Sequence, residues 1–469
     1  MRILALPDML GVNELLRRYR EGVLRPRQIV DLTLERIAAA EATNPSIWIS
    51  RVPAAEVRAR SHELAAVGPL SDLPLYGVPF AVKDNIDIAG MPTTAACPAF
   101  AYTPNRHAGS VRRLLDAGAI LVGKTNLDQF ATGLTGTRSP YGACESVFGG
   151  ELVSGGSSSG SAVAVAAGLV PFALGTDTAG SGRVPAAMNG IVGLKPTRGL
   201  VGTSGVVPAC RSLDCVSVFT GDLADAEAVL DVLAGPDPED TWSRTAPAAS
   251  KSRAAPAHDG SRTAPATSAS EAGFRLAVAD KGELDFEHDA PMAAAYLSAQ
   301  ARAAARATGV HRTPIAPLLE AGELLYGPWV AERLARLADF LAEHPGDVLP
   351  VTRAVIERGH EYSAVDAFAA IHRLRELRTW SARIWEHADA LLLPTVPTTF
   401  TRAQIAEQPV ERNLVLGRYT QFANLLDMSA VAFPAGLTDD GRPVGLSLLG
   451  PAFAEARLLR IAHHLQESS

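Results

Sequence analysis

Three short segments carry lysine and serine residues in an order suited to serine hydrolase chemistry. Lys83 follows the apolar run PFAV, a Gly/Ser-rich loop SGGSSSGS spans residues 154–161, and a second loop, GTDTAGSGR, spans residues 175–183. A serine hydroxyl becomes a good nucleophile only when a base removes its proton, and no histidine lies within or near these segments. Lysine can replace histidine if burial lowers its pKa from about 10.4 to about 7 to 8.

Simpler interpretations of the same segments stay open at this point. Lys83 can instead pair with a buried carboxylate such as Asp84, and the first serine loop can be a flexible linker. The loop, however, leads directly into an alanine-rich apolar run, which favours a tight backbone site. In the second loop, small residues follow an expected strand, so several backbone N–H groups can converge on one point, as in an oxyanion hole.

Two further motif matches are not expected to carry function. GAILVGKT, residues 118–125, fits the P-loop pattern, but a helix is expected before Gly118 and the four intervening residues form an apolar strand rather than a loop. GSSSG, residues 156–160, fits the nucleophile elbow of α/β-hydrolases, but it lacks the apolar strand that the elbow must end. We therefore expect neither a nucleotide site nor that hydrolase fold.

The elements around these segments predict an α/β protein with one extended mixed sheet. Alternating apolar residues predict a strand that ends at Lys83, and helix-then-strand patterns recur in SVRRLLDAGAILV and SAVAVAAGLVPFAL. DALLLPT and PVGLSLLG predict later strands. GPWVAERLARLADFL predicts a helix with Pro328 in its first turn and a core stripe of Val330, Leu334, Leu337 and Leu341.

Composition limits the classes of protein that this chain can belong to. Its 469 residues are 47% hydrophobic and 20% charged, and the formal net charge of −7 disfavours nucleic-acid binding. The longest uncharged apolar stretch has 13 residues, so no membrane-spanning segment is expected. Four cysteines without C-x-x-C spacing and no signal peptide favour a cytoplasmic protein, and no metal-ligand cluster is seen.

The middle of the chain divides it into two parts. In residues 245–272, 22 of the 28 residues are Ala, Pro, Ser, Thr or Gly, and none is a large apolar residue. Such a segment cannot offset the entropy of ordering, so we expect a disordered, low-complexity surface insertion. It separates residues 1–244, which hold the motifs, from residues 273–469, which hold a helical segment and the C-terminal strands.

Over nearly the whole chain these motifs resemble the amidase signature family, whose serine hydrolases use a Ser-cisSer-Lys triad. The resemblance implies the family's fold, a large mixed β-sheet covered by helices on both faces. It also implies that Lys83 is the base, Ser157 the bridging serine held by a cis peptide, and Ser181 the acyl-forming nucleophile. The backbone N–H groups of Thr178, Ala179, Gly180 and Ser181 would form the oxyanion hole. The family's chemistry implies no cofactor and no metal.

NLDQFATGLTGTRSPYG, GTDTAGSGRVPA, SLDCVSVF and GPWVAER are similar to one subfamily, the allophanate hydrolases. This similarity implies that Gly133, Tyr326 and Arg333 contact substrate, although LLYGPWVAER has one residue fewer than usual between the tyrosine and the glycine. Without the resemblance, Arg333 would be interpreted as an arginine that covers apolar surface and keeps its charge in water. Allophanate carries a carboxylate, which a planar guanidinium binds well.

The resemblance therefore implies an amidohydrolase that releases ammonia and carbon dioxide from allophanate. The alternatives are an amidase for other small carboxamides and the glutaminase subunit of a tRNA-dependent amidotransferase. A small molecule is the expected partner, with no nucleic acid and no membrane, and a homodimer is expected because related enzymes are commonly dimers. The longer members of the subfamily carry a further C-terminal domain, and no function of such a domain is expected of this sequence.

Overall fold

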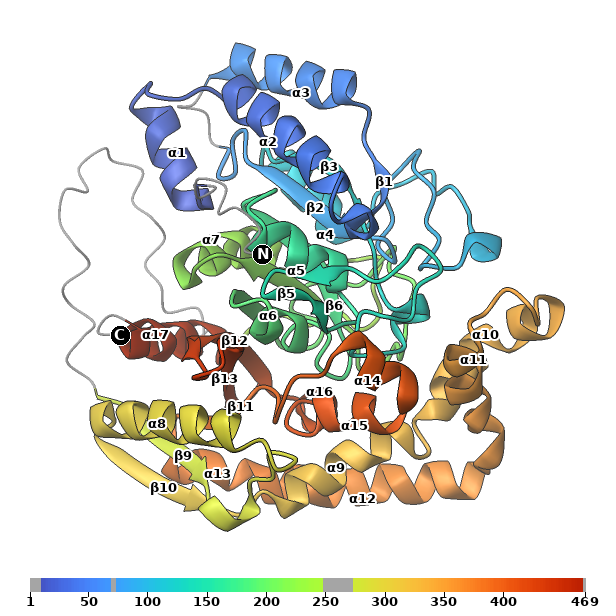
Figure 1. The fold of residues 1–469 in the computed structure, drawn as a ribbon, viewed down its shortest axis with the longest axis vertical. Helices are drawn as coiled ribbons and strands as arrows, with labels where there is room; N and C mark the ends of the chain where they lie inside the picture. Colours follow the sequence, from blue (N-terminus) through green and yellow to red (C-terminus); the bar gives the residue numbers. More distant parts are fainter. Residues whose placement is uncertain (1–9, 69–72, 248–272, 467–469) are drawn as a thin grey trace.

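The computed structural model describes residues 10–68, 73–247 and 273–466. Of the expected low-complexity insertion, residues 248–272 lie outside the described residues. The described helices surround a sheet that crosses the middle of the molecule (Figure 1).

One eleven-stranded sheet is the core of the fold, with strands in the order β1-β3-β2-β6-β8-β7-β12-β13-β11-β9-β10. The sheet is mixed, because β2 pairs in parallel with β3 and β6, and β9 with β10 and β11, while the other pairs are antiparallel. The strands are β1 (Trp48–Arg51), β2 (Pro79–Lys83), β3 (Ile120–Thr125), β6 (Phe172–Asp177), β7 (Val192–Lys195), β8 (Cys215–Thr220), β9 (Arg275–Ala279), β10 (Gly309–Thr313), β11 (Ala390–Pro394), β12 (Ser429–Leu437) and β13 (Pro443–Gly450). A separate hairpin joins β4 (Glu145–Ser146) to β5 (Gly149–Val153).

The helices of the first half of the chain are α1 (Val12–Arg20), α2 (Pro26–Glu41), α3 (Ala54–Val67), α4 (Gly109–Asp116), α5 (Ser159–Ala166), α6 (Val184–Met188) and α7 (Leu223–Leu233). Those of the second half are α8 (Ala290–Arg306), α9 (Ala316–Tyr326), α10 (Val330–Glu343), α11 (Pro350–Glu357), α12 (Ala364–Ala382), α13 (Ile384–His387), α14 (Arg402–Glu407), α15 (Glu411–Gly417), α16 (Phe422–Leu425) and α17 (Glu455–Gln466). Both halves supply strands to the one sheet.

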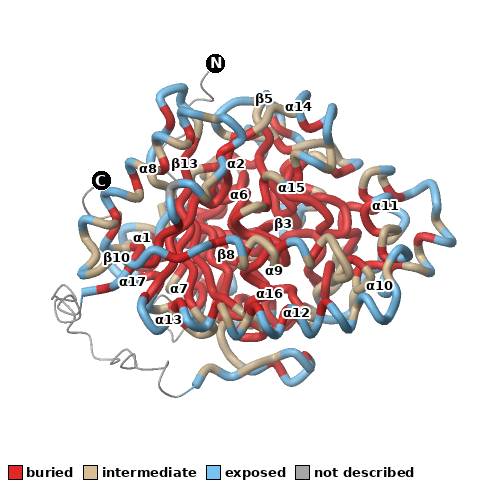
Figure 2. The backbone as a smooth tube through the Cα atoms, turned by 90° about the horizontal axis from the view of Figure 1, so that it is seen from below, coloured by how far each residue is buried: buried red, intermediate tan, exposed pale blue. Residues whose placement is uncertain are grey.

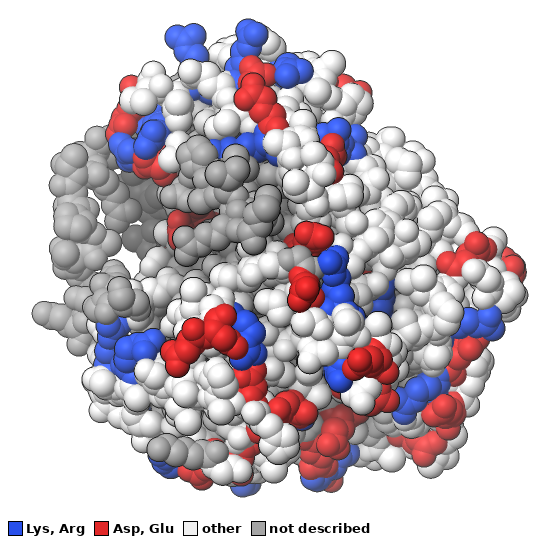
Figure 3. Space-filling view, in the orientation of Figure 1, with Lys and Arg blue, Asp and Glu red and all other residues white. Residues whose placement is uncertain are grey.

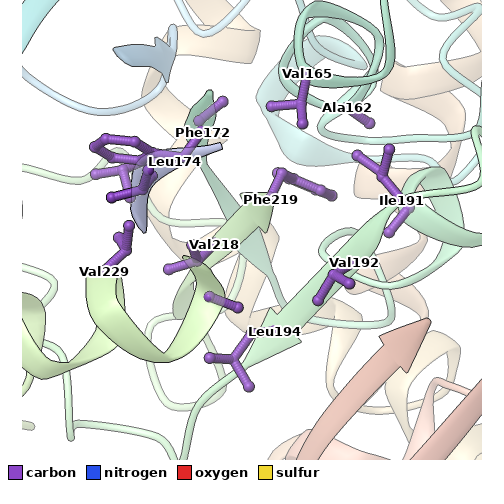
Figure 4. Close-up of a cluster of buried hydrophobic side chains, with 14 of the residues drawn as sticks. Ala162, Val165, Phe172, Leu174, Ile191, Val192, Leu194, Val218, Phe219 and Val229 are labelled. Carbon is purple, nitrogen blue, oxygen red and sulfur yellow. The ribbon is translucent and has the colours of Figure 1, made fainter. Parts of the chain in front are cut away.

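Both faces of the sheet are buried under helices, as predicted. Leu392 belongs to the larger apolar cluster with α8 and α17, while its neighbours Leu391 and Leu393 belong to a second cluster with α9, α12 and α16. On β8, Val218 lies beside α7, and the adjacent Phe219 points toward α5 (Figure 4). The buried residues therefore form a continuous central layer, with exposed positions around its rim (Figure 2).

The predicted strands and helices that carry the motifs are confirmed. β2 ends at Lys83, α4 and β3 form the expected helix-then-strand unit, and α5 leads into β6. In the GAILVGKT segment, Lys124 is part of strand β3, where its amine lies 3.0 Å from Asp84 Oδ1 and donates to Thr93 Oγ1. The P-loop interpretation fails because this lysine is committed to a buried ion pair.

One helix start differs from the expectation. Helix α10 begins at Val330, so Pro328 precedes the helix instead of lying in its first turn. The reason is that the N–H groups of Gly327 and Trp329 still donate to carbonyls of α9, at Glu323 and Leu324. The predicted core stripe of α10 is buried as expected.

Charges of both signs are interspersed over the face seen in Figure 3, so this face carries no large field of one sign. Within the described ranges, no helix is both long and apolar enough to cross a membrane.

Candidate active site

The strand that ends at Lys83 delivers its amine into the interior of the protein. β2 pairs in parallel with β6, so the carboxyl ends of the two strands, Lys83 and Thr176–Asp177, meet at the same edge of the sheet. There Lys83 Nζ donates to Ser157 Oγ at 2.8 Å and to Thr176 Oγ1 at 2.7 Å. The side chain is 0% exposed. Lysine and the first predicted serine are therefore in direct contact.

Burial lowers the pKa of Lys83 to about 7, although the negative charges of Asp128, Asp214 and Asp177 favour the ammonium form. The expected desolvation of the lysine is thus present. The alternative partner Asp84 is not bonded to Lys83, because it forms its ion pair with Lys124. Near neutral pH a substantial share of Lys83 is therefore unprotonated and can accept a proton.

A cis peptide bond joins Gly156 to Ser157. The backbone around it is fixed from the neighbouring loop, because Asp128 N–H donates to Ser157 O at 3.0 Å and Gly156 N–H donates to Leu134 O at 2.9 Å. Glycine is required at position 156, since a Cβ there would lie 2.2 Å from Asp128 Oδ2. This packing sets the direction in which the Ser157 side chain points.

The second serine loop is built around a buried ion pair. The Asp177 carboxylate accepts two bonds from the Arg183 guanidinium, both at 2.9 Å, and both side chains are 0% exposed. It also accepts from the N–H groups of Gly180 at 2.9 Å and Gly182 at 3.0 Å. Burial alone would raise the pKa of Asp177, but Arg183 holds it below the ordinary value. The hydrogen bonds that the Asp177 carboxylate accepts thus hold the conformation of the loop that carries Ser181.

Of the four N–H groups predicted to form the oxyanion hole, one is already hydrogen-bonded within the loop. The N–H of Gly180 is committed to Asp177, whereas the N–H groups of Thr178, Ala179 and Ser181 have no hydrogen-bond partner among the described residues. Gly180 has a φ of +131°, and a Cβ there would lie 2.2 Å from Thr420 Oγ1. Gly180 therefore shapes the loop, and the other three N–H groups remain without an acceptor among the described residues.

Ser181 is 3% exposed at the end of this loop. Within the described chain, its side chain forms no hydrogen bond, so the contact with Ser157 stays a prediction.

The three predicted substrate-binding residues meet at residues 132–134. Arg333, 3% exposed, donates from Nη1 to Thr132 Oγ1 at 2.8 Å, so its guanidinium is inside the protein and not in water as the surface interpretation required. Gly133 follows Thr132, and a Cβ on Gly133 would lie 2.6 Å from Asp128 Oδ2. On the other side, Leu134 N–H donates to Asn413 Oδ1 at 2.7 Å, and Asn413 Nδ2 lies 3.5 Å from the Tyr326 hydroxyl.

A second buried arginine lies against the same segment. Arg138, also 3% exposed, donates from Nη1 to Thr132 O at 3.0 Å. Arg333 and Tyr326 both lie near enough to influence its ionisation. Neither arginine forms an ion pair with a carboxylate in the described part of the chain. The two guanidinium groups therefore bring positive charge to the Thr132 segment, and the nearby Asp128 carboxylate offsets part of it.

Asp128 connects the Thr132 segment to Ser157. Its carboxylate accepts from the N–H groups of Gly136 at 3.0 Å and Arg138 at 2.8 Å, while its own N–H donates to Ser157 O. Asp128 lies in the segment NLDQFATGLTGTRSPYG, and its role was not predicted from the sequence. An acidic residue that precedes a glycine-rich loop was the available signal, since such a side chain can bind several free N–H groups.

Comparison with known proteins places the chain in a family. The Amidase family model matches residues 28–459, so this protein belongs to the amidase family. The fold agrees: the Kluyveromyces lactis allophanate hydrolase superposes with a TM-score of 0.87 at 39% identity, covering 97% of this chain and 72% of that one. The predicted resemblance to the amidase signature family, near allophanate hydrolase, is confirmed.

Two relatives differ in how much of their length is matched. Urea amidolyase of Saccharomyces cerevisiae is 43% identical over 420 residues, which cover 89% of this chain but 22% of that protein. The chain thus spans about a fifth of that relative. A glutamyl-tRNA(Gln) amidotransferase subunit from Symbiobacterium thermophilum is 36% identical over 494 residues, covering 98% of this chain and 96% of that protein.

Proposed function

We propose that the protein hydrolyses the terminal amide of allophanate through a serine acyl-enzyme. The observation that carries the proposal is the buried Arg333, which lies with Arg138 on the Thr132 segment and lacks a carboxylate partner among the described residues. A carboxylate next to the amide to be cleaved would supply the missing charge. The likeness to allophanate hydrolase and to urea amidolyase supports the same substrate.

In the proposed mechanism the unprotonated Lys83 removes a proton from Ser157, which in turn takes the proton of Ser181. The Ser181 oxygen attacks the amide carbonyl, and the N–H groups of Thr178, Ala179 and Ser181 stabilise the negative oxygen of the tetrahedral intermediate. Ammonia leaves with a proton returned through Ser157. Water then hydrolyses the acyl-enzyme by the same relay, and the released dicarboxylated amine decays to ammonia and carbon dioxide.

The alternative of an amidotransferase glutaminase is supported by the amidotransferase relative, because that protein is matched over nearly its full length. A glutaminase of that kind would need a partner protein and would release ammonia from glutamine. A general amidase would hydrolyse neutral carboxamides as fast as charged ones. Ammonia release from allophanate, biuret, malonamic acid, glutamine and propionamide, measured in parallel, separates the three. We expect kcat/KM to be highest for allophanate, and a preference for glutamine or propionamide would reject the proposal.

We further propose that the enzyme is a homodimer of the cytoplasm. Helix α12 runs along the edge of the molecule (Figure 1) and exposes Val365, Phe368 and Ile371, at 76%, 62% and 49%. Their spacing is symmetric about Phe368, so an antiparallel α12 of a second copy would oppose apolar residues at all three positions. The four cysteines are free and buried, which suits a reducing compartment.

Light scattering tests the dimer. Phe368→Glu should convert the dimer to a monomer, whereas Leu437→Glu, at another exposed apolar position on β12, should leave the mass unchanged. A wild-type protein that is monomeric at micromolar concentration would contradict the proposed dimer.

A further inference from the structure

Asp214 contacts the second serine loop, residues 175–183, through Thr178 and is not part of the proposed proton relay. It precedes strand β8 and is 7% exposed. Its Oδ1 accepts a hydrogen bond from the hydroxyl of Thr178, whose own backbone N–H has no partner among the described residues. We propose that Asp214 is a positioning residue for catalysis, which orients the Thr178 N–H toward the oxyanion by holding the Thr178 side chain.

The Asp214 carboxylate is itself rigidly held. Its Oδ2 accepts from Ala209 N–H at 2.9 Å, and its Oδ1 also accepts from Cys210 N–H at 3.2 Å. The backbone N–H of Asp214 donates to Cys210 O at 2.9 Å, which closes a turn around the side chain. A carboxylate fixed in this way gives the Thr178 hydroxyl a single, well-defined acceptor.

Asn424 holds the segment before Thr178 close to the segment before Asp214. Asn424 Nδ2 donates to Asp177 O at 2.8 Å and to Leu213 O at 2.9 Å, so one amide joins the residue before Thr178 to the residue before Asp214. The Asp177 carbonyl and the Thr178 N–H belong to the same peptide unit, so the Asn424 bond holds the plane of that unit. The Asp214–Thr178 bond holds the side chain on the Cα that follows, which keeps this peptide unit from rotating and so maintains the direction of the Thr178 N–H.

Asp214 contacts Thr178 of the second serine loop on one side and lies near Arg333 on the other. The Cys210 thiol is close to the Arg333 guanidinium, and the charges of Arg333 and Asp214 influence each other's ionisation. Burial raises the pKa of Asp214 to about 6, so the carboxylate is charged at neutral pH and remains an acceptor only. The inference rests on the proposed amide hydrolysis at this loop, but not on allophanate as the substrate.

Two substitutions of Thr178 test the role of the hydroxyl. Thr178→Val keeps the shape of the side chain and removes the donor, while Thr178→Ser keeps the donor. Losing one oxyanion donor outright costs about 100- to 1,000-fold in kcat, so misdirecting one should cost about 10- to 100-fold. We expect that loss for Thr178→Val with KM changed by less than about threefold, and at least a partial rescue in Thr178→Ser.

The substrate dependence separates this role from the proposed substrate preference. Because every amide forms the same oxyanion, Thr178→Val should lower kcat by the same factor for allophanate and for neutral propionamide. If allophanate proves not to be the substrate, the factor can still be measured with propionamide. Unchanged kcat in Thr178→Val, or a loss confined to KM, would overturn the positioning role.

Asp214→Ala is the complementary variant, because an asparagine would keep an oxygen that can accept from the Thr178 hydroxyl. Since both residues act through one bond, the double variant Thr178→Val/Asp214→Ala should lose about as much kcat as the more impaired single variant, and additive losses would reject the coupling. Asp225→Ala is the matched control: Asp225 is another buried carboxylate, with its pKa raised to about 6 by burial, that accepts from the N–H groups of Val12 and Asn13. It should lower the melting temperature and leave kcat unchanged, so an equal loss of kcat in Asp225→Ala would assign both effects to stability.

Discussion

Lys83 Nζ lies 2.8 Å from Ser157 Oγ, and this contact joins the end of strand β2 to the loop before α5. Its other bond, to Thr176, holds the amine at the carboxyl end of the neighbouring strand. Burial removes the water that would stabilise its charge, and among the described residues both of its hydrogen-bond partners are neutral hydroxyl groups, so its pKa falls although nearby carboxylates oppose the change. The burial of Lys83 therefore allows it to act as the base of the proposed relay near neutral pH.

The relay predicts that its three members cannot replace one another. Ser181→Ala should abolish turnover, and Lys83→Ala and Ser157→Ala should each lower kcat by several orders of magnitude, because each interrupts the same proton transfer. Ammonia release measured with allophanate gives the rates. The folded state should persist, as judged by circular dichroism.

Non-additivity gives the sharper comparison. The double variant Lys83→Ala/Ser157→Ala should be no slower than the slower single variant, because the relay has already failed. Activity close to wild type in any single variant would refute the mechanism.

The lowered pKa of Lys83 predicts how the rate depends on pH. The catalytic form is the unprotonated amine, which is present above a pKa of about 7 and is lost as the pH falls. The value of kcat/KM should therefore rise through about pH 7 and level off above it, and at one unit below the pKa about a tenth of the enzyme is active. Initial rates with propionamide, which is stable over this range, check the profile.

A control for this profile is the stability of the protein, which should be followed by circular dichroism at each pH. A rate that is flat from pH 6 to 9, with the fold intact, would mean that Lys83 is already neutral or is not the base. A midpoint near that of free lysine would mean that its burial does not lower its pKa.

Local patterns were enough to predict the elements that carry the site. Alternating apolar residues located β2 and therefore Lys83, and an alanine-rich run located α5 beyond the first serine loop. Such patterns report which residues face a core, and strand and helix periods differ clearly. The order of the lysine and the serine loops along the chain then indicated the chemistry.

The supporting residues could not be predicted, because their partners are far away in the sequence. Asn424 bonds to Asp177 and Asn413 bonds to Leu134, across 247 and 279 residues respectively. The sequence around a helical asparagine does not show whether its side chain binds a distant backbone group or lies on the surface. The bond between the Gly180 N–H and Asp177 could not be predicted either, since only the folded loop brings the two groups together.

The buried pair of Asp177 and Arg183 predicts a large effect on stability. Arg183→Met removes the guanidinium and leaves the carboxylate buried without a counter-charge, which costs about 3 to 5 kcal/mol of unfolding free energy. Urea unfolding followed by tryptophan fluorescence measures the change. Activity should fall as well, because Asp177 also binds the N–H groups of Gly180 and Gly182.

The exposed pair of Arg373 and Glu320 is a suitable control for this measurement. Its two side chains are 47% and 40% exposed, so Arg373→Met should hardly move the urea midpoint. If Arg183→Met were as well tolerated as Arg373→Met, the loop would be held chiefly by its backbone contacts and not by the ion pair.

The last prediction concerns Arg333 and decides between allophanate and a general range of amides. If the guanidinium binds the substrate carboxylate, Arg333→Ala leaves that charge unpaired in a desolvated pocket, at a cost of about 2 to 5 kcal/mol. This equals a loss of roughly 30- to several-thousand-fold in kcat/KM for allophanate. Arg333→Lys should restore little of it, because an ammonium cannot present the same planar pair of donors.

Propionamide is the control substrate, since it has no carboxylate and its slow hydrolysis should change little in either variant. A variant that is merely destabilised would lose activity toward both substrates together. Equal losses would therefore leave Arg333 as a residue that supports the Thr132 segment through its 2.8 Å hydrogen bond. An undiminished rate with allophanate would place the substrate carboxylate elsewhere, and Arg138 on the same segment would be the next residue to replace.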